Sequence, residues 1–195
     1  MLSAAEVARY ADVGQLTLGF RLSEDTVAQI ERKMDALFAA HPELDPDYAP
    51  GLIELDQSWL EIAASPEILD AVGQLIGNDI IVWGSAFFCK RGKGGKATPW
   101  HQDGQYWPMR PLESLTVWIA IDRSTQENGC LRVIPGSHKR REMLDHSDAA
   151  SDKVVLSQAV SEAAMPDFEP LDVVLEPGQI SIHDAFVVHG AEPNN

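Results

Sequence analysis

The most informative stretch of this sequence is Thr98-Pro99-Trp100-His101-Gln102-Asp103-Gly104. In a β-strand, residues two positions apart point to the same face of the sheet. His101 and Asp103 can therefore present an imidazole and a carboxylate to one metal ion. A second histidine from a distant strand would complete a set of two histidines and one carboxylate and leave coordination positions open. That arrangement is typical of non-haem iron(II) oxygenases.

The His-x-Asp spacing alone is not specific, because the chain contains it twice. His146-Ser147-Asp148 repeats the spacing, but it lies in a charged stretch without a strand pattern, so the first pair is preferred. The third ligand has two candidates. His183 ends a predicted strand, whereas His189 follows two valines and precedes Gly190, which permits close approach of the backbone. The local sequence alone gives no preference between His183 and His189 as the third ligand.

Short β-type segments separated by turn residues dominate the second half of the chain. Strands are predicted over residues 80–89, 115–121, 131–134, 171–175 and 179–182. Before them, apolar residues at helical spacing follow the capping residues Ser3 and Ser23 and the Ser65-Pro66 pair. We therefore expect one domain, mainly β with flanking helices and a sandwich or small barrel at its centre. The helical scaffold is predicted over 1–78, the β core over 79–195, and a loop excursion with a functional role over 138–170.

Composition excludes several classes of protein. The net charge is -15 and the pI about 4.6, so the chain repels phosphate backbones and a general nucleic-acid binder is not expected. No apolar run is long enough for a membrane span, and the N-terminus has no signal-peptide pattern. Two cysteines, Cys89 and Cys130, are too few for a disulfide framework and favour a reducing cytoplasm.

Three blocks of sequence resemble a known family. They are the run from Trp100 to Pro108, the run from Asn128 to His138, and Pro177-Gly178 followed by His189-Gly190. Over Phe88 to Asn195, a little over half the chain, the sequence is similar to the phytanoyl-CoA dioxygenase family of 2-oxoglutarate oxygenases. The resemblance implies a double-stranded β-helix, the jelly-roll barrel of cupins. It also implies Fe(II) held by His101, Asp103 and His189, with 2-oxoglutarate as cosubstrate, dioxygen and a small-molecule substrate.

Two features of the family pattern refine this expectation. Related halogenases carry a small residue at the position of Asp103, so the carboxylate here argues for hydroxylation. The family also places a 2-oxoglutarate-binding arginine on a strand shortly after the distal histidine, whereas this sequence stops at Asn194-Asn195. We expect that this sequence is truncated and that its C-terminal strand is missing, because a barrel short of a strand would expose an edge.

The residues around the metal motif predict a charged or zwitterionic substrate. Two basic clusters, Lys90-Arg91-Lys93-Lys96 and Lys139-Arg140-Arg141, flank the diagnostic blocks of an acidic chain. Such runs are commonly solvated surface, and the sharper interpretation is that Lys90 and Arg141 draw anions to the pocket. Trp118 is expected beside the cosubstrate, and Tyr106 and Trp107 at the substrate mouth. Aromatic faces with nearby cations suit a zwitterionic or anionic small molecule, and the family resemblance implies a phosphonate or an amino-acid-like compound.

Two other functions remain open at this point. The same ligands in a non-catalytic cupin-type binding protein would hold a structural or sensory metal, and the missing arginine favours that alternative slightly. A zinc hydrolase would also accept two histidines and a carboxylate, although no general base lies next to the motif.

Overall fold

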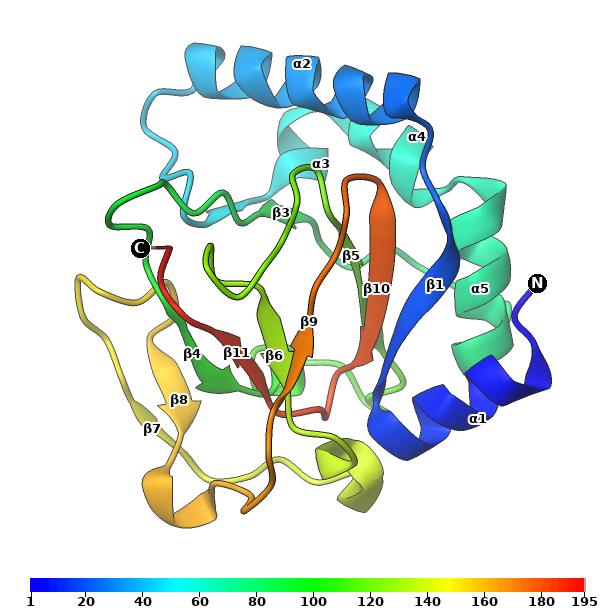
Figure 1. Ribbon diagram of the computed structural model, residues 1–195, viewed down its shortest axis with the longest axis vertical. Coiled ribbons are helices and arrows are strands. Elements are labelled where there is room, and N and C mark those ends of the chain that lie inside the picture. Colours follow the sequence, from blue (N-terminus) through cyan, green and yellow to red (C-terminus); the bar gives the residue numbers. More distant parts are fainter. Residues whose placement is uncertain (195) are drawn as a thin grey trace.

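The computed structural model describes residues 1–194, so Asn195, the last residue of the predicted core, lies outside the described residues. Two antiparallel sheets face each other, and helices cover one of them (Figure 1). The first sheet has the order β1-β10-β5, with β1 at Gln15–Arg21, β10 at Gln179–Asp184 and β5 at Leu115–Ile119. The second has the order β4-β11-β6-β9, with bounds Thr98–His101, His189–Ala191, Leu131–Val133 and Leu171–Val173.

This arrangement confirms the predicted jelly-roll class. Within residues 1–194, the hydrogen-bonded ladders do not join the two sheets into a closed barrel, and β5 has β10 as its single strand neighbour. Two short hairpins lie outside the sheets: β2 (Ala49–Pro50) with β3 (Ala86–Phe87), and β7 (His146–Asp148) with β8 (Gln158–Val160). The β7–β8 hairpin occupies the predicted excursion.

Helices begin at the predicted capping residues. Ser3 forms a capping box ahead of α1 (Ala4–Val13), Ser23 caps α2 (Glu24–Ala40), and Pro66 opens α5 (Pro66–Ile76). The short helices α3 (Leu52–Leu55) and α4 (Leu60–Ala63) lie between α2 and α5 in the chain. In the described chain, no helix is both long and apolar enough to cross a membrane.

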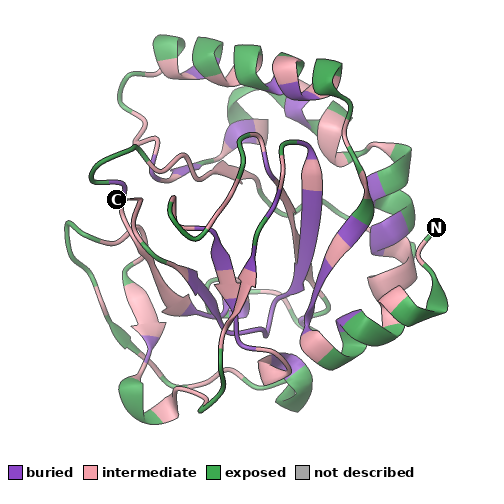
Figure 2. Ribbon diagram, viewed as in Figure 1, coloured by how far each residue is buried: buried purple, intermediate pink, exposed green. Residues whose placement is uncertain are grey.

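Side chains of β10 alternate between two environments. Ile180 and Ile182 pack with Leu16, Ile68 and Val72, which places them in the core between the first sheet and its helices. Ser181 and His183, on the opposite face, are equally buried and turn toward the second sheet. Figure 2 shows β10 buried along most of its length. The strand therefore has an apolar face toward the helices and a polar face toward the interior of the jelly roll.

Three local predictions differ from the structure. Residues 15–21 form β1, although the N-terminal part was expected to be helical, because pairing with β10 outweighs local propensity. Of the strand predicted over 80–89, only Ala86–Phe87 pairs, and Ile81 and Trp83 are exposed. His146 lies in a strand, β7, where no strand was expected.

Candidate metal centre

Two strands of the second sheet bring the predicted histidines together. His101 ends β4, His189 begins β11, and the two residues are directly paired across the ladder. Asp103 opens the short 3-10 helix η2 (Asp103–Gln105), which follows β4. One ligand atom from each residue lies within 4.8 Å of the other two. The structure thus brings together the three residues that the sequence and the family resemblance selected.

Backbone carbonyls orient both imidazole rings. Nδ1 of His101 lies 2.8 Å from the Pro99 carbonyl oxygen, and Nδ1 of His189 lies 3.0 Å from the Val187 carbonyl oxygen. Because a carbonyl oxygen only accepts hydrogen bonds, each Nδ1 carries the hydrogen and donates it. In the neutral rings, Nε2 is then the bare nitrogen, and both Nε2 atoms face Asp103. This is how a protein prepares histidines as metal ligands.

The Asp103 carboxylate lies between these rings and the first sheet. Its Oδ1 is 3.3 Å from Nε2 of His101 and 3.5 Å from Nε2 of His189. Its Oδ2 accepts a hydrogen bond of 2.6 Å from the Thr116 hydroxyl and lies 3.3 Å from Nε2 of His183. One oxygen therefore faces the two histidine ligands, and the other is held by β5 and β10.

Burial and charge act against each other in this centre. Burial would raise the pKa of Asp103, but the charge of His189 and hydrogen bonds from the surrounding histidines hold that pKa well below its ordinary value. Burial, followed by the charge of His189, lowers the pKa of His101. Burial also works to lower the pKa of His189, yet the neighbouring Asp103 raises it. The carboxylate is thus ionised and His101 is neutral at neutral pH, the states that metal binding requires.

The other two candidate histidines take different places. His183 is almost fully buried beside Asp103 but does not belong to the group of mutually close ligand atoms. His146 is held elsewhere: its Nε2 accepts from the Gln102 backbone N–H at 3.3 Å, and its Nδ1 lies 2.9 Å from the Leu144 carbonyl oxygen. Its role in the structure is to connect β7 to the end of β4.

A cavity of about 870 Å³ opens beside the centre. Its walls come mainly from residues 79–90 and 113–124, together with parts of the helical region, and His101 and Asp103 contribute to its lining. All three aromatic residues predicted for the site, Tyr106, Trp107 and Trp118, line it as well. Such a volume suits a small molecule together with a cosubstrate.

Other aromatic residues of this cavity, Tyr48 and Phe88 among them, were not predicted as site residues. Phe88 stacks on Trp118 with ring centroids 5.7 Å apart, and Tyr48 lies 4.9 Å from Phe88. Tyr48 comes from a proline-containing loop without periodicity, so no local signal points to it. Thr116 could have been found, because it lies two positions before Trp118 on a predicted strand and must share its face.

Comparison with known proteins identifies the family. A model of the phytanoyl-CoA dioxygenase (PhyH) family matches residues 6–195, nearly the whole chain. The chain belongs to this family.

Curated relatives agree with the family assignment. The chain is 30% identical over 150 residues to a probable phytanoyl-CoA dioxygenase of Caenorhabditis elegans, an alignment that covers 71% of this chain and 47% of the relative. It is 31% identical over 147 residues to the phytanoyl-CoA dioxygenase domain-containing protein 1 homolog of Dictyostelium discoideum. This alignment covers 73% of the chain and 52% of the relative. The chain spans about half the length of these relatives.

Solved structures show the same fold. EctD from S. alaskensis, crystallised with 2-oxoglutarate and 5-hydroxyectoine, aligns with a TM-score of 0.82 and 21% identity over 99% of this chain and 71% of that one. The non-haem α-ketoglutarate-dependent carbocyclase SnoK from nogalamycin biosynthesis also aligns with a TM-score of 0.82, at 24% identity over 99% and 78%. At these sequence identities, the structural similarity establishes that this chain has the jelly-roll fold.

The donor set of the centre fits the iron(II) that such proteins use. Two buried imidazoles and one ionised carboxylate form the ligand type of non-haem iron sites. All three converge from one end of the second sheet, which leaves the side toward the cavity for further ligands.

Most of the basic residues in the two clusters are paired with protein groups. Lys90 lines the cavity, but its ammonium group donates to the carbonyl oxygens of Gly129 and Glu192, and burial lowers its pKa to about 8. Arg141 does not line the cavity: its guanidinium pairs with Asp184 at 2.7 Å.

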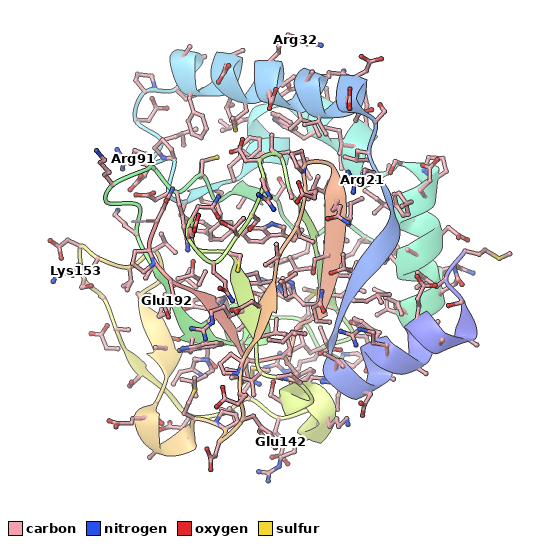
Figure 3. The ribbon with its side chains drawn as sticks, viewed as in Figure 1. Arg21, Arg32, Arg91, Glu142, Lys153 and Glu192 are labelled. Atoms are coloured by element: carbon pink, nitrogen blue, oxygen red, sulfur yellow. The ribbon has the colours of Figure 1, made fainter. Side chains whose placement is uncertain are left out.

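The neighbours of these two residues behave alike. Lys139 pairs with Asp12, and Lys96 pairs with Asp45. Arg91, at the periphery of the molecule (Figure 3), pairs with Asp45 and Asp47. The two clusters thus contribute mainly surface and structural ion pairs.

Proposed function

We propose that the chain carries an Fe(II)- and 2-oxoglutarate-dependent hydroxylase centre in which His101, Asp103 and His189 hold the metal. The observation that carries the proposal is that a ring nitrogen from each of two histidines and one carboxylate oxygen lie within 4.8 Å of one another, beside a large cavity that His101 and Asp103 help to line. When bound, iron and 2-oxoglutarate supply the oxidising chemistry: one atom of dioxygen enters succinate, released with CO2, and the other enters a C–H bond of the substrate.

The protein's own residues position the reactants. Pro99 and Val187 carbonyl groups hold the two imidazoles in one tautomer, so that neither ring has to reorient when the metal binds. Asp103 supplies the one negative charge among the ligands, and its presence favours hydroxylation over halide transfer. Tyr106, Trp107 and Trp118 form an apolar wall that excludes water from the reacting C–H bond.

We also propose that the substrate is small and zwitterionic or anionic, with an amino-acid-like or phosphonate-like group. Aromatic faces at Tyr48, Phe88 and Trp118 suit an ammonium group. Of the two cations predicted to bind substrate, Lys90 lines the cavity and Arg141 does not, so we assign Arg141 no role in substrate binding. Among the relatives are a probable hypophosphite dioxygenase of Stutzerimonas stutzeri, an ectoine dioxygenase of Sphingopyxis alaskensis and an L-proline trans-4-hydroxylase of Streptomyces griseoviridis. A cytoplasmic location is part of the proposal, supported by two free cysteines.

Turnover of 2-oxoglutarate by the full-length, iron-loaded protein tests the proposal. Succinate release and substrate hydroxylation would be measured across phosphonates, amino-acid derivatives and acyl thioesters, with Asp103→Ala as the control. We expect equal amounts of succinate and hydroxylated product with one class, and loss of both in the control. Iron binding without turnover of any compound would favour the cupin-type binding function, and hydrolysis with zinc in the absence of dioxygen would favour the hydrolase.

A further inference from the structure

Asp103 lies between two pairs of residues that face each other from opposite sheets. On the second sheet, His101 and His189 are register partners of β4 and β11. On the first sheet, Thr116 and His183 are register partners of β5 and β10. Each pair projects toward the same carboxylate, so Oδ1 faces the ligand pair and Oδ2 faces the second pair.

The contacts at Oδ2 have a defined direction. An ionised carboxylate only accepts hydrogen bonds, so both Thr116 Oγ1 and His183 Nε2 must donate to it. In neutral His183, Nδ1 is then bare, and this buried atom has no hydrogen-bond partner among the described residues. Burying a polar atom without a partner opposes folding. A purely structural role therefore gives no reason for a histidine here, whereas donation to Asp103 does.

The number of carboxylate oxygens on the metal matters for the proposed reaction. A carboxylate can bind a cation through one oxygen or through both. Binding through both would occupy a position that the cosubstrate or dioxygen needs, because two histidines and a carboxylate leave three positions open only if each contributes one atom. Two donors on Oδ2 oppose its approach to the metal.

We propose that Thr116 and His183 are positioning residues that hold Oδ2 of Asp103, so that the carboxylate binds the metal through Oδ1 alone. This inference rests on the proposed function, since it requires a metal at His101, Asp103 and His189. It assigns a role to a histidine that the sequence could only weigh as a possible third ligand.

Paired substitutions test the idea in the full-length protein, with Co²⁺ as the probe. Thr116→Val and His183→Leu remove the hydrogen-bond donors, whereas Thr116→Ser and His183→Gln each keep a donor at the substituted position. Ser181→Ala is the matched control, because Ser181 is a fully buried hydroxyl on the same face of β10 that bonds to Gln15 and not to a ligand. The readouts are Co²⁺ affinity by calorimetry, the visible ligand-field spectrum of bound Co²⁺, and the melting temperature.

We expect Thr116→Val and His183→Leu to weaken Co²⁺ binding about 10- to 100-fold and to change the ligand-field spectrum. The donor-keeping variants should restore both, and Ser181→Ala should change only the melting temperature. The inference is overturned if the donor-removing variants bind Co²⁺ with wild-type affinity and spectrum. Thr116→Val is nearly isosteric and carries the test if His183→Leu fails to fold. A wild-type protein that binds no Co²⁺ would instead refute the proposed metal site itself.

Discussion

Replacing Gly190 with alanine should destabilise the protein and loosen the metal centre, because β11 lies against β4 without room for a methyl group. A Cβ atom at this position would lie 3.0 Å from the Thr98 carbonyl oxygen and 3.2 Å from Cδ2 of Trp100. The Thr98 oxygen belongs to the strand backbone and cannot rotate away. The backbone of Gly190 itself is not left-handed, so the effect comes from crowding and not from its dihedral angles.

The expected size follows from two opposing effects. Overpacking typically costs about 1–3 kcal/mol, and the reduced freedom of the unfolded alanine chain returns about 0.4–1 kcal/mol. A net loss of about 1–2 kcal/mol lowers the melting temperature by about 2–8 °C in a chain of this length. If about 1.4 kcal/mol of the strain is relieved by moving His189 away from His101, metal affinity falls about tenfold.

Thermal unfolding and Co²⁺ titration would measure the two effects. Gly19→Ala is the matched control, since its Cβ would meet only Oε1 of Glu6, at an ordinary 3.7 Å. The control should melt at or slightly above the wild-type temperature and bind Co²⁺ equally well. If Gly190→Ala behaves like the control in both measurements, the close packing of β11 on β4 does not constrain the centre and the reasoning fails.

Two further predictions concern residues outside the centre. Arg141→Ala should lower the free energy of unfolding by about 2 kcal/mol, below the roughly 3–5 kcal/mol of a fully buried pair, because Asp184 is buried but the arginine is partly exposed. Urea unfolding would measure this, and Arg140→Ala, at an exposed position, should change little. Alkylation of Cys89 in the folded protein should accelerate about tenfold per pH unit up to about pH 11, because burial, reinforced by Asp122 and Asp47, raises the pKa of its thiol to about 11. Mass spectrometry of the labelled peptide would measure the alkylation rate. A rate that stops rising near pH 9 would contradict the buried environment of the Cys89 thiol.

Local sequence patterns predicted much of the fold. Alternating apolar residues and turn dipeptides indicated β5, β6, β9 and β10, each within a few residues of its observed bounds, and capping residues located the starts of α1, α2 and α5. These signals are readable because they depend on neighbours in the chain. β1 was missed since its strand conformation depends on pairing with β10, which lies more than 150 residues away.

The sequence by itself paired His101 with Asp103, because side chains two residues apart on extended backbone point to the same side. Gln102 between them is extended, although Asp103 itself opens η2. The local sequence could not separate His183 from His189, which are six residues apart and similarly buried. The family resemblance selected His189, and the tertiary structure places the two histidines on opposite sides of Asp103, because the chain crosses from one sheet to the other between them. His189 then pairs with His101, and His183 pairs with Thr116 on the opposite side of Asp103. Strand register sets which atoms meet, and register depends on contacts that no local pattern encodes.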